Sequence, residues 1–144
     1  MDELTRLART AAAGDQYALE AFVRQSHGDI HRLCASLVDP ESADDLTQET
    51  FVRALRSLGS FRGDSSARTW LWAIARNTCT DAIRRRIRHR AALERLPHPE
   101  VESVDDEPAA AYAGVLDELD ADQRTAFVLT QLLDLSYAEA ARVC

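Results

Sequence analysis

Apolar residues recur at three- and four-residue steps along most of the chain, and this spacing predicts helices. Leu4 to Ala13 is predicted to be a short alanine-rich helix that ends at Gly14, and Asp15 can cap the next helix. One stripe of that second helix is apolar: Leu19, Phe22, Val23, Ile30, Leu33, Cys34 and Leu37. No segment alternates apolar and polar residues as a strand does, so the sequence predicts an all-α helical bundle.

Two more helices are predicted in the middle of the chain. Asp39 as N-cap and Pro40 at the first helical position start one that extends from Glu41 to about Leu58. Its buried side is expected to consist of Leu46, Ala54, Leu55 and Leu58. Gly59 to Ser66 has two glycines and three serines, which predicts a loop.

Asp64 in that loop can cap a long helix that continues to about Arg95. Trp70 and Trp72 lie about 200° apart around its axis, so at least one is expected to be partly exposed. Trp70 is expected to be the buried one.

The last third of the sequence is organised differently. Residues 96–111 hold three of the four prolines and a cluster of acids, which predicts a flexible acidic linker. Tyr112–Leu119 and Ala121–Leu133 are predicted helices, and Ser136 with Glu139 has capping-box spacing. Since the chain stops eight residues after Ser136, we expect it to be a fragment.

Charge divides the chain into three parts. The 144 residues carry a net charge of −7, yet residues 62–95 hold nine arginines and only three acids. Acids outnumber arginines on both sides of this segment. A local basic segment with two tryptophans is typical of nucleic-acid contact, with cations for phosphates and aromatic faces for bases.

Composition also limits location and chemistry. Three widely spaced cysteines suit a reducing cytoplasm, and no apolar run is long enough to insert into a membrane. His27, His31 and Cys34 share a helix face, but without a fourth ligand we expect no zinc site and no other metal or cofactor. No nucleotide-binding or hydrolase motif occurs, so the chain is expected not to be an enzyme.

On a helix, Asp45, Gln48, Glu49 and Arg53 form one polar face. Such a face is most often only solvated, but a glutamine between carboxylates also suits a protein contact.

Two segments together resemble a known family. ADDLTQETFVRAL, followed by SFRGDSSARTWLWAIARNTCTDAIRRR, is similar to the core-binding and promoter-melting segments of bacterial RNA polymerase sigma factors. The resemblance is strongest to the group IV, extracytoplasmic-function type. It implies sigma domain 2 over residues 1–95 and an incomplete sigma domain 4 over residues 112–144. The recognition helix that reads the −35 element is expected to be missing.

The resemblance implies a role for each group of residues. Those that contact the clamp coiled coil of the polymerase β′ subunit are Asp45, Gln48, Glu49 and Arg53. A pocket for a base flipped from the −10 non-template strand is formed by Phe61, Arg62, Gly63, Asp64, Ser65, Ser66 and Ala67. Asn77 helps read that base or its neighbour, and upstream DNA is contacted by Arg76, Asp81, Arg84 and Arg85.

The implied function is that of a transcription initiation factor that binds core RNA polymerase, recognises and melts the −10 element, and is held by an anti-sigma factor. Three alternatives stay open. The arginine-rich helix could bind duplex DNA alone, or the chain could only be sequestered by an anti-sigma factor. Acidic residues could instead form a metal-dependent nuclease site: Asp44, Asp45, Glu49 and Asp81.

Overall fold

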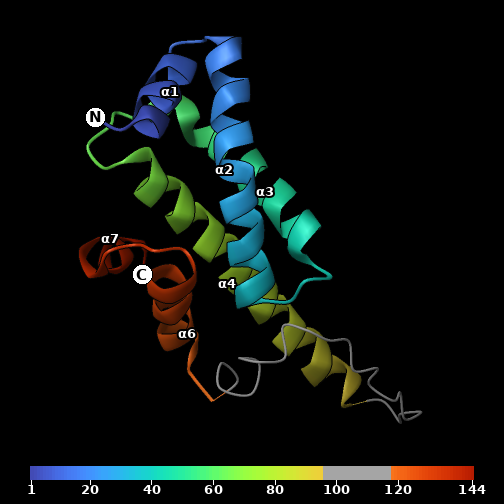
Figure 1. The fold of residues 1–144 in the computed structure, drawn as a ribbon. Coiled ribbons are helices and arrows are strands. Elements are labelled where there is room, and N and C mark those ends of the chain that lie inside the picture. Colours follow the sequence, from blue (N-terminus) through green and yellow to red (C-terminus); the bar gives the residue numbers. More distant parts are fainter. Residues whose placement is uncertain (96–117) are drawn as a thin grey trace.

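The computed structural model describes residues 1–95 and 118–144, and every regular element in these ranges is a helix. The elements are α1 (Glu3–Ala12), α2 (Gln16–Leu37), α3 (Ala43–Ser57), η1 (Leu58–Ser60), α4 (Ala67–Leu93), α6 (Ala121–Phe127), η2 (Val128–Leu132) and α7 (Tyr137–Val143). Figure 1 shows α1 to α4 as a bundle with α6 and α7 beside α4. The predicted all-α fold is confirmed. The predicted linker and most of the predicted helix 112–119 lie outside the described residues.

Short polar side chains start the helices, mostly as the sequence predicts. Asp15 Oδ1 accepts the Ala18 N–H at 2.8 Å, and Gly14 takes a φ of +105° to turn the chain out of α1. The capping box of Ser136 and Glu139 is present at the start of α7. At α4, Ser66 is the N-cap and accepts the Thr69 N–H at 3.1 Å, so the assignment of Asp64 as the cap is wrong.

The start of α3 also differs from the prediction. Residues 40–42 form a turn, and the helix begins at Ala43 with Ser42 as its N-cap. Asp39 Oδ1 accepts the Ser42 N–H at 2.7 Å, so its carboxylate closes the turn instead of capping the helix. Burial raises the pKa of Asp39, but hydrogen bonds from Arg86 and Ser42 outweigh it and hold that pKa below its usual value.

The buried side of α3 is shifted relative to the expected one. Leu46, Ala54 and Leu58 are buried, but Leu55 is 45% exposed, and Phe51 takes a core position instead. Thr47 and Thr50 are also buried, and their hydroxyls donate to the carbonyls of Ala43 and Leu46 at 2.6 and 2.7 Å. Because these hydroxyls are satisfied within the helix, the core accommodates them at little cost.

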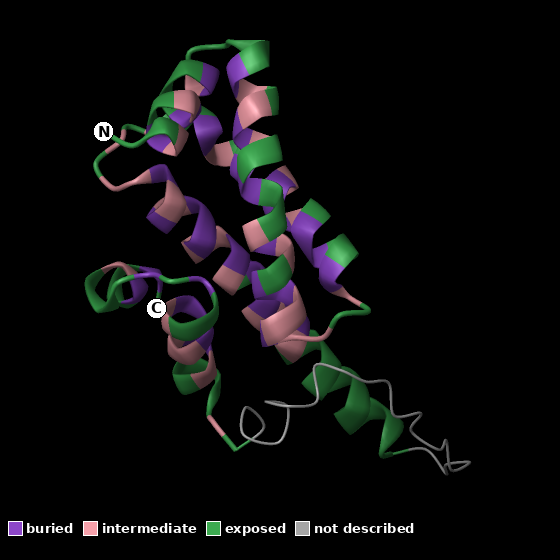
Figure 2. Cartoon of the chain, in the orientation of Figure 1, coloured by how far each residue is buried: buried purple, intermediate pink, exposed green. Residues whose placement is uncertain are grey.

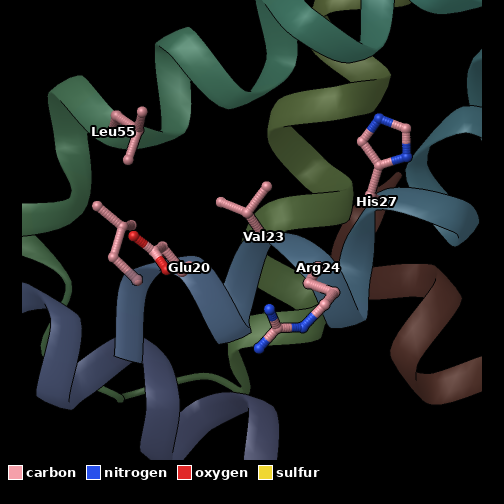
Figure 3. A pocket seen from close by; sticks show the side chains of 6 residues that line it. Glu20, Val23, Arg24, His27 and Leu55 are labelled. Atoms are coloured by element: carbon pink, nitrogen blue, oxygen red, sulfur yellow. The ribbon is translucent and has the colours of Figure 1, made fainter. Parts of the chain in front are cut away.

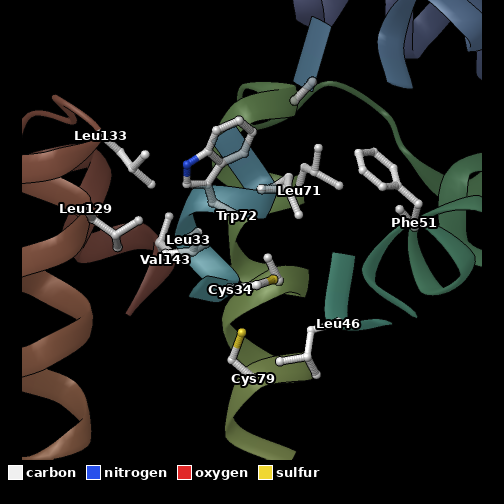
Figure 4. Packing of buried hydrophobic residues seen from close by; sticks show 14 of the residues in the cluster. Leu33, Cys34, Leu46, Phe51, Leu71, Trp72, Cys79, Leu129, Leu133 and Val143 are labelled. Carbon is white, nitrogen blue, oxygen red and sulfur yellow. The ribbon is translucent and has the colours of Figure 1, made fainter. Parts of the chain in front are cut away.

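The core of the bundle lies where α2, α3 and α4 face one another (Figure 4). Trp72 is the buried tryptophan, at 1% exposure, whereas Trp70 is only partly buried and packs on Phe61 with ring centroids 5.0 Å apart. The expectation that Trp70 is the buried one is therefore wrong. Figure 2 shows α4 changing from buried to exposed along its length, and residues 84–93 are all exposed.

The C-terminal helices pack on the bundle. α7 contacts α4, and η2 contacts α2. This unit buries Val128, Leu129, Leu133, Leu135, Ala140 and Val143. Leu132, at the end of the π-helical turn η2, is 40% exposed. Within the described ranges no helix is long and apolar enough to span a bilayer.

Candidate functional site

The predicted polar face of α3 is present. Asp45 and Gln48 are exposed, and Glu49 and Arg53 are half-buried. Opposite them, Leu46 and Ala54 anchor the helix in the core. The face is thus held rigidly from behind while its amide and carboxylate groups reach solvent, as a protein-binding surface requires.

Arg53 joins two groups of residues that the sequence analysis kept apart. Its Nε donates to Glu49 Oε1 at 3.1 Å, and its Nη1 donates to Asp81 Oδ2 of α4 at 2.8 Å. The hydrogen bond from Arg53 holds the pKa of Asp81 below its usual value, and Asp81 and Glu49 raise the pKa of Arg53. The expected polymerase and DNA residues therefore meet in one ion-pair cluster across α3 and α4.

The loop before α4, residues 61–66, is held in a defined conformation by local contacts. Gly63 has a φ of +80°, a conformation that favours glycine. The ring of Phe61 packs against the ring of Trp70. Arg62 and Asp64 are exposed, Ser65 and Ser66 are half-buried, and Ala67 is fully buried. The first residues of the loop can therefore reach a ligand, whereas Ala67 supports the loop from inside.

The predicted DNA residues of α4 fall into two environments. Asn77, Arg84 and Arg85 are exposed on the helix, as a ligand-contacting role requires. Arg76 is half-buried, and its Nη2 donates to Asp122 Oδ1 of α6 at 2.9 Å. Arg86, in the same basic run, pairs with Asp39 and Ser42 and so ties α4 to the α2–α3 turn.

The C-terminal unit covers part of α4. Arg68 donates to the Leu133 carbonyl at 2.7 Å, and its guanidinium lies 5.6 Å from the Trp72 ring centroid. Trp72 Nε1 and Arg76 Nε are buried, and neither has a hydrogen-bond partner among the described residues. The polar groups at this contact are therefore only partly matched, although it also holds the hydrogen bonds of Arg68 and Arg76.

An open apolar groove lies between α2 and α3, and the sequence analysis missed it (Figure 3). Its lining residues are Leu19, Glu20, Val23, Arg24, His27 and Leu55. A neighbouring hollow extends it along α3 to Gln48 and Val52. Leu19 and Val23 are partly buried at the edge of the core, and Leu55 is exposed. Helical periodicity predicts such an apolar stripe but does not show whether another element covers it.

The histidines and cysteines do not converge on a common site. His31 Nε2 lies 2.9 Å from Asp44 Oδ1, while the ring of His27 stacks on Phe51. Cys34 is buried beside Cys79, and a hydrogen bond with Cys34 together with burial raises the pKa of the Cys79 thiol. In the parts of the chain that the structure describes, no three His, Cys, Asp or Glu side chains are grouped to hold a metal ion.

Known proteins share this sequence and this fold. The Sigma-70 region 2 family matches residues 22–89, and the Sigma-70 region 4 family matches residues 110–144. The chain is 46% identical to the ECF RNA polymerase sigma factor SigC of Mycobacterium tuberculosis, over 99% of this chain and 80% of that protein.

Two solved structures are also similar. CnrH, in complex with the cytosolic domain of CnrY, has a TM-score of 0.74 and 31% identity, covering 99% of this chain and 82% of that chain. The sigma factor RpoE of Bartonella quintana, in complex with the anti-sigma factor NepR, has a TM-score of 0.70 and 28% identity, covering 88% and 82%. These matches confirm the resemblance seen in the sequence. The chain belongs to the extracytoplasmic-function RNA polymerase sigma factors, which are transcription initiation factors.

Proposed function

We propose that this sigma factor acts in the cytoplasm, binds core RNA polymerase through α3, and opens promoters by holding the −10 non-template strand in the 61–67 loop. α3 supports the first part, because Gln48 is exposed beside an apolar groove that a partner helix can fill. The observation that carries the second part is the loop itself, where Gly63 and the Phe61–Trp70 contact shape an exposed segment next to the basic helix α4.

The charges fit a factor that depends on polymerase. The whole chain carries −7, which opposes binding to random duplex DNA, whereas exposed Arg84 and Arg85 supply local attraction. Capture of an already unpaired base needs little area, since stacking one base on an aromatic ring contributes about 1–3 kcal/mol. Within this proposal the chain is a non-enzymatic specificity factor.

Anti-sigma factors belong to the same proposal. The two solved structures described above are complexes, and the partner bound to RpoE is the anti-sigma factor NepR. The open groove on α2 and α3 and the basic face of α4 are surfaces on which such a partner would compete with polymerase and DNA.

A fork-junction selection tests the function. DNA with a duplex upstream part and randomised single-stranded non-template positions is mixed with core polymerase and this chain, and bound molecules are sequenced. We expect enrichment of one short sequence only when both proteins are present. Tight, salt-sensitive binding of plain duplex by the chain alone would favour the stand-alone duplex-binding alternative.

Asn77 gives a test of the α4 assignment. Asn77→Ala is expected to leave polymerase binding intact and to reduce promoter opening by roughly tenfold, since losing one good base contact costs about 1–3 kcal/mol. Permanganate reactivity of unpaired thymines measures the opening. Thr80→Ala, a nearby half-buried position on α4, is the control. Normal opening with Asn77→Ala would show that the assignment is wrong.

Breaking the Arg76–Asp122 ion pair is expected to strengthen DNA binding, in contrast to the loss expected for Asn77→Ala. Asp122→Asn removes the partner of Arg76 and frees its guanidinium for DNA. Because partly exposed ion pairs contribute about 0.2–1 kcal/mol, we expect fork DNA to bind up to roughly fivefold more tightly. Asp134→Asn makes the same charge change at another exposed position of the C-terminal unit. Equal gains in both variants would mean that net charge, and not release of Arg76, is responsible.

A further inference from the structure

Helix α1 lies against the loop that is proposed to hold the flipped base. Figure 1 shows the N-terminal helix beside the connection from η1 to α4, and α1 contacts both of these elements. The matched Sigma-70 region 2 segment begins only at residue 22, so that match does not include α1.

The first contact fixes the end of the loop. The buried Ala67 N–H donates to Thr5 Oγ1 at 2.9 Å, across 62 residues of sequence. The Thr5 hydroxyl in turn donates to Asp2 Oδ2 at 2.6 Å. Since that hydroxyl has one proton and gives it to Asp2, its lone pairs are left for Ala67. The N–H at the start of α4, which has no partner within its own helix, is thereby satisfied by α1.

The second contact places a cation on the loop. The side chain of Arg9 lies over Gly63, so closely that a Cβ on Gly63 would be 3.2 Å from Arg9 Cδ and 3.8 Å from Nε. Arg9 is exposed, and no carboxylate among residues 1–95 and 118–144 lies within ion-pair distance of it. Among the residues that the structure describes, its guanidinium has a hydrogen bond only to the Met1 sulfur at 3.8 Å, a weak acceptor. The positive charge of Arg9 is therefore available at the loop surface.

We infer that Arg9 is a strand-binding residue, whose guanidinium contacts a phosphate of the single strand held in the 61–67 loop. Thr5 is a positioning residue that fixes the loop end at Ala67. This inference rests on the proposed function and extends the site to a helix outside the matched family segment. A planar guanidinium can donate two parallel hydrogen bonds to phosphate oxygens.

The test separates the charge of Arg9 from its packing. The most enriched fork DNA from the selection above serves as probe, with this chain bound to core polymerase, and affinity is measured by fluorescence anisotropy at several salt concentrations. Arg9→Met keeps an apolar stem over Gly63 without the charge, and Arg9→Lys keeps the charge. Arg6→Met is the matched control, because Arg6 is exposed on the same helix and pairs with Glu3 at 3.9 Å.

Affinity falls with salt, so the slope of log affinity against log salt is negative. We expect Arg9→Met to make this slope less steep by about 0.7, the value for one phosphate contact on a single strand. Arg9→Lys and Arg6→Met should keep the wild-type slope. An unchanged slope in Arg9→Met, or equal losses in Arg9→Met and Arg6→Met, overturns the role of Arg9. If the wild-type chain on polymerase enriches no sequence, the proposed function fails first, and this inference falls with it.

The role of Thr5 has a different signature. Thr5→Val should keep the salt slope but bind the probe and its single-base variants with nearly equal affinity, because the loop end is no longer held. Thr5→Ser, which retains the hydroxyl, should restore the preference. A preference that Thr5→Val leaves intact, or that Thr5→Ser fails to restore, contradicts the positioning role.

Discussion

Trp72→Ala is expected to lower the free energy of unfolding by about 3–5 kcal/mol, the usual cost of emptying a buried aromatic site. Trp72 is 1% exposed, and Figure 4 shows its ring between the residues of the bundle core and the Leu129, Leu133 and Val143 side chains of the C-terminal unit. The substitution thus opens a cavity and loosens a contact between two parts of the chain. Urea unfolding followed by circular dichroism measures the change.

Two further variants make this expectation specific. Trp70→Ala should cost clearly less, because Trp70 is only partly buried against Phe61. Trp72→Phe should also cost less than Trp72→Ala, since it keeps a ring and removes an indole N–H that has no partner among the described residues. A larger loss for Trp70→Ala than for Trp72→Ala would contradict this packing of the two rings.

Replacing both Gln48 and Glu49 with alanine is expected to abolish co-elution of the chain with core polymerase. Gln48 is exposed at the hollow that extends the α2–α3 groove, where a partner helix would desolvate it. Glu49 is half-buried on the same polar face of α3 and accepts a hydrogen bond from Arg53. If this polar pair is an interface hot spot, its loss costs about 2 kcal/mol or more, which is roughly thirtyfold in affinity. Sizing chromatography with purified core polymerase checks the result.

The fold should survive this double change, because neither side chain is in the core. A matched control is Gln25→Ala with Glu41→Ala, two exposed residues of the same types. If the control also loses co-elution, or if the Gln48 and Glu49 variant still co-elutes, α3 is not the polymerase contact. Circular dichroism on each variant confirms that loss of binding is not loss of fold.

The Glu49–Arg53–Asp81 cluster connects the polar face of α3 to α4. Their side chains are between 32% and 46% exposed, so each pair contributes only about 0.2–1 kcal/mol. The cluster therefore contributes little stability. Its effect is that Arg53 neutralises the negative charge of Asp81 on the helix that is proposed to face DNA. Arg53 therefore links α3 to α4 through one side chain.

Most helix positions could be predicted from the sequence. Asp15, Gly14 and the Ser136–Glu139 pair act on groups within four residues of themselves, and local hydrogen bonds of this kind can be read from spacing alone. The predicted start of α3 was wrong because a polar side chain near a helix end can bond to a turn or to a distant residue instead of capping the helix. Asp39 had a second use, in a turn bound to Arg86.

By itself the sequence determined the helical class, most helix boundaries, the division of charge and the motifs of the sigma factor family. The tertiary structure alone decided which tryptophan is buried, that Arg53 reaches Asp81, that Asp122 holds Arg76, and that Thr5 and Arg9 support the loop. Those contacts join residues 28 to 62 positions apart. Helical periodicity states which side of a helix is apolar, but only packing determines which neighbour covers that side or leaves it open.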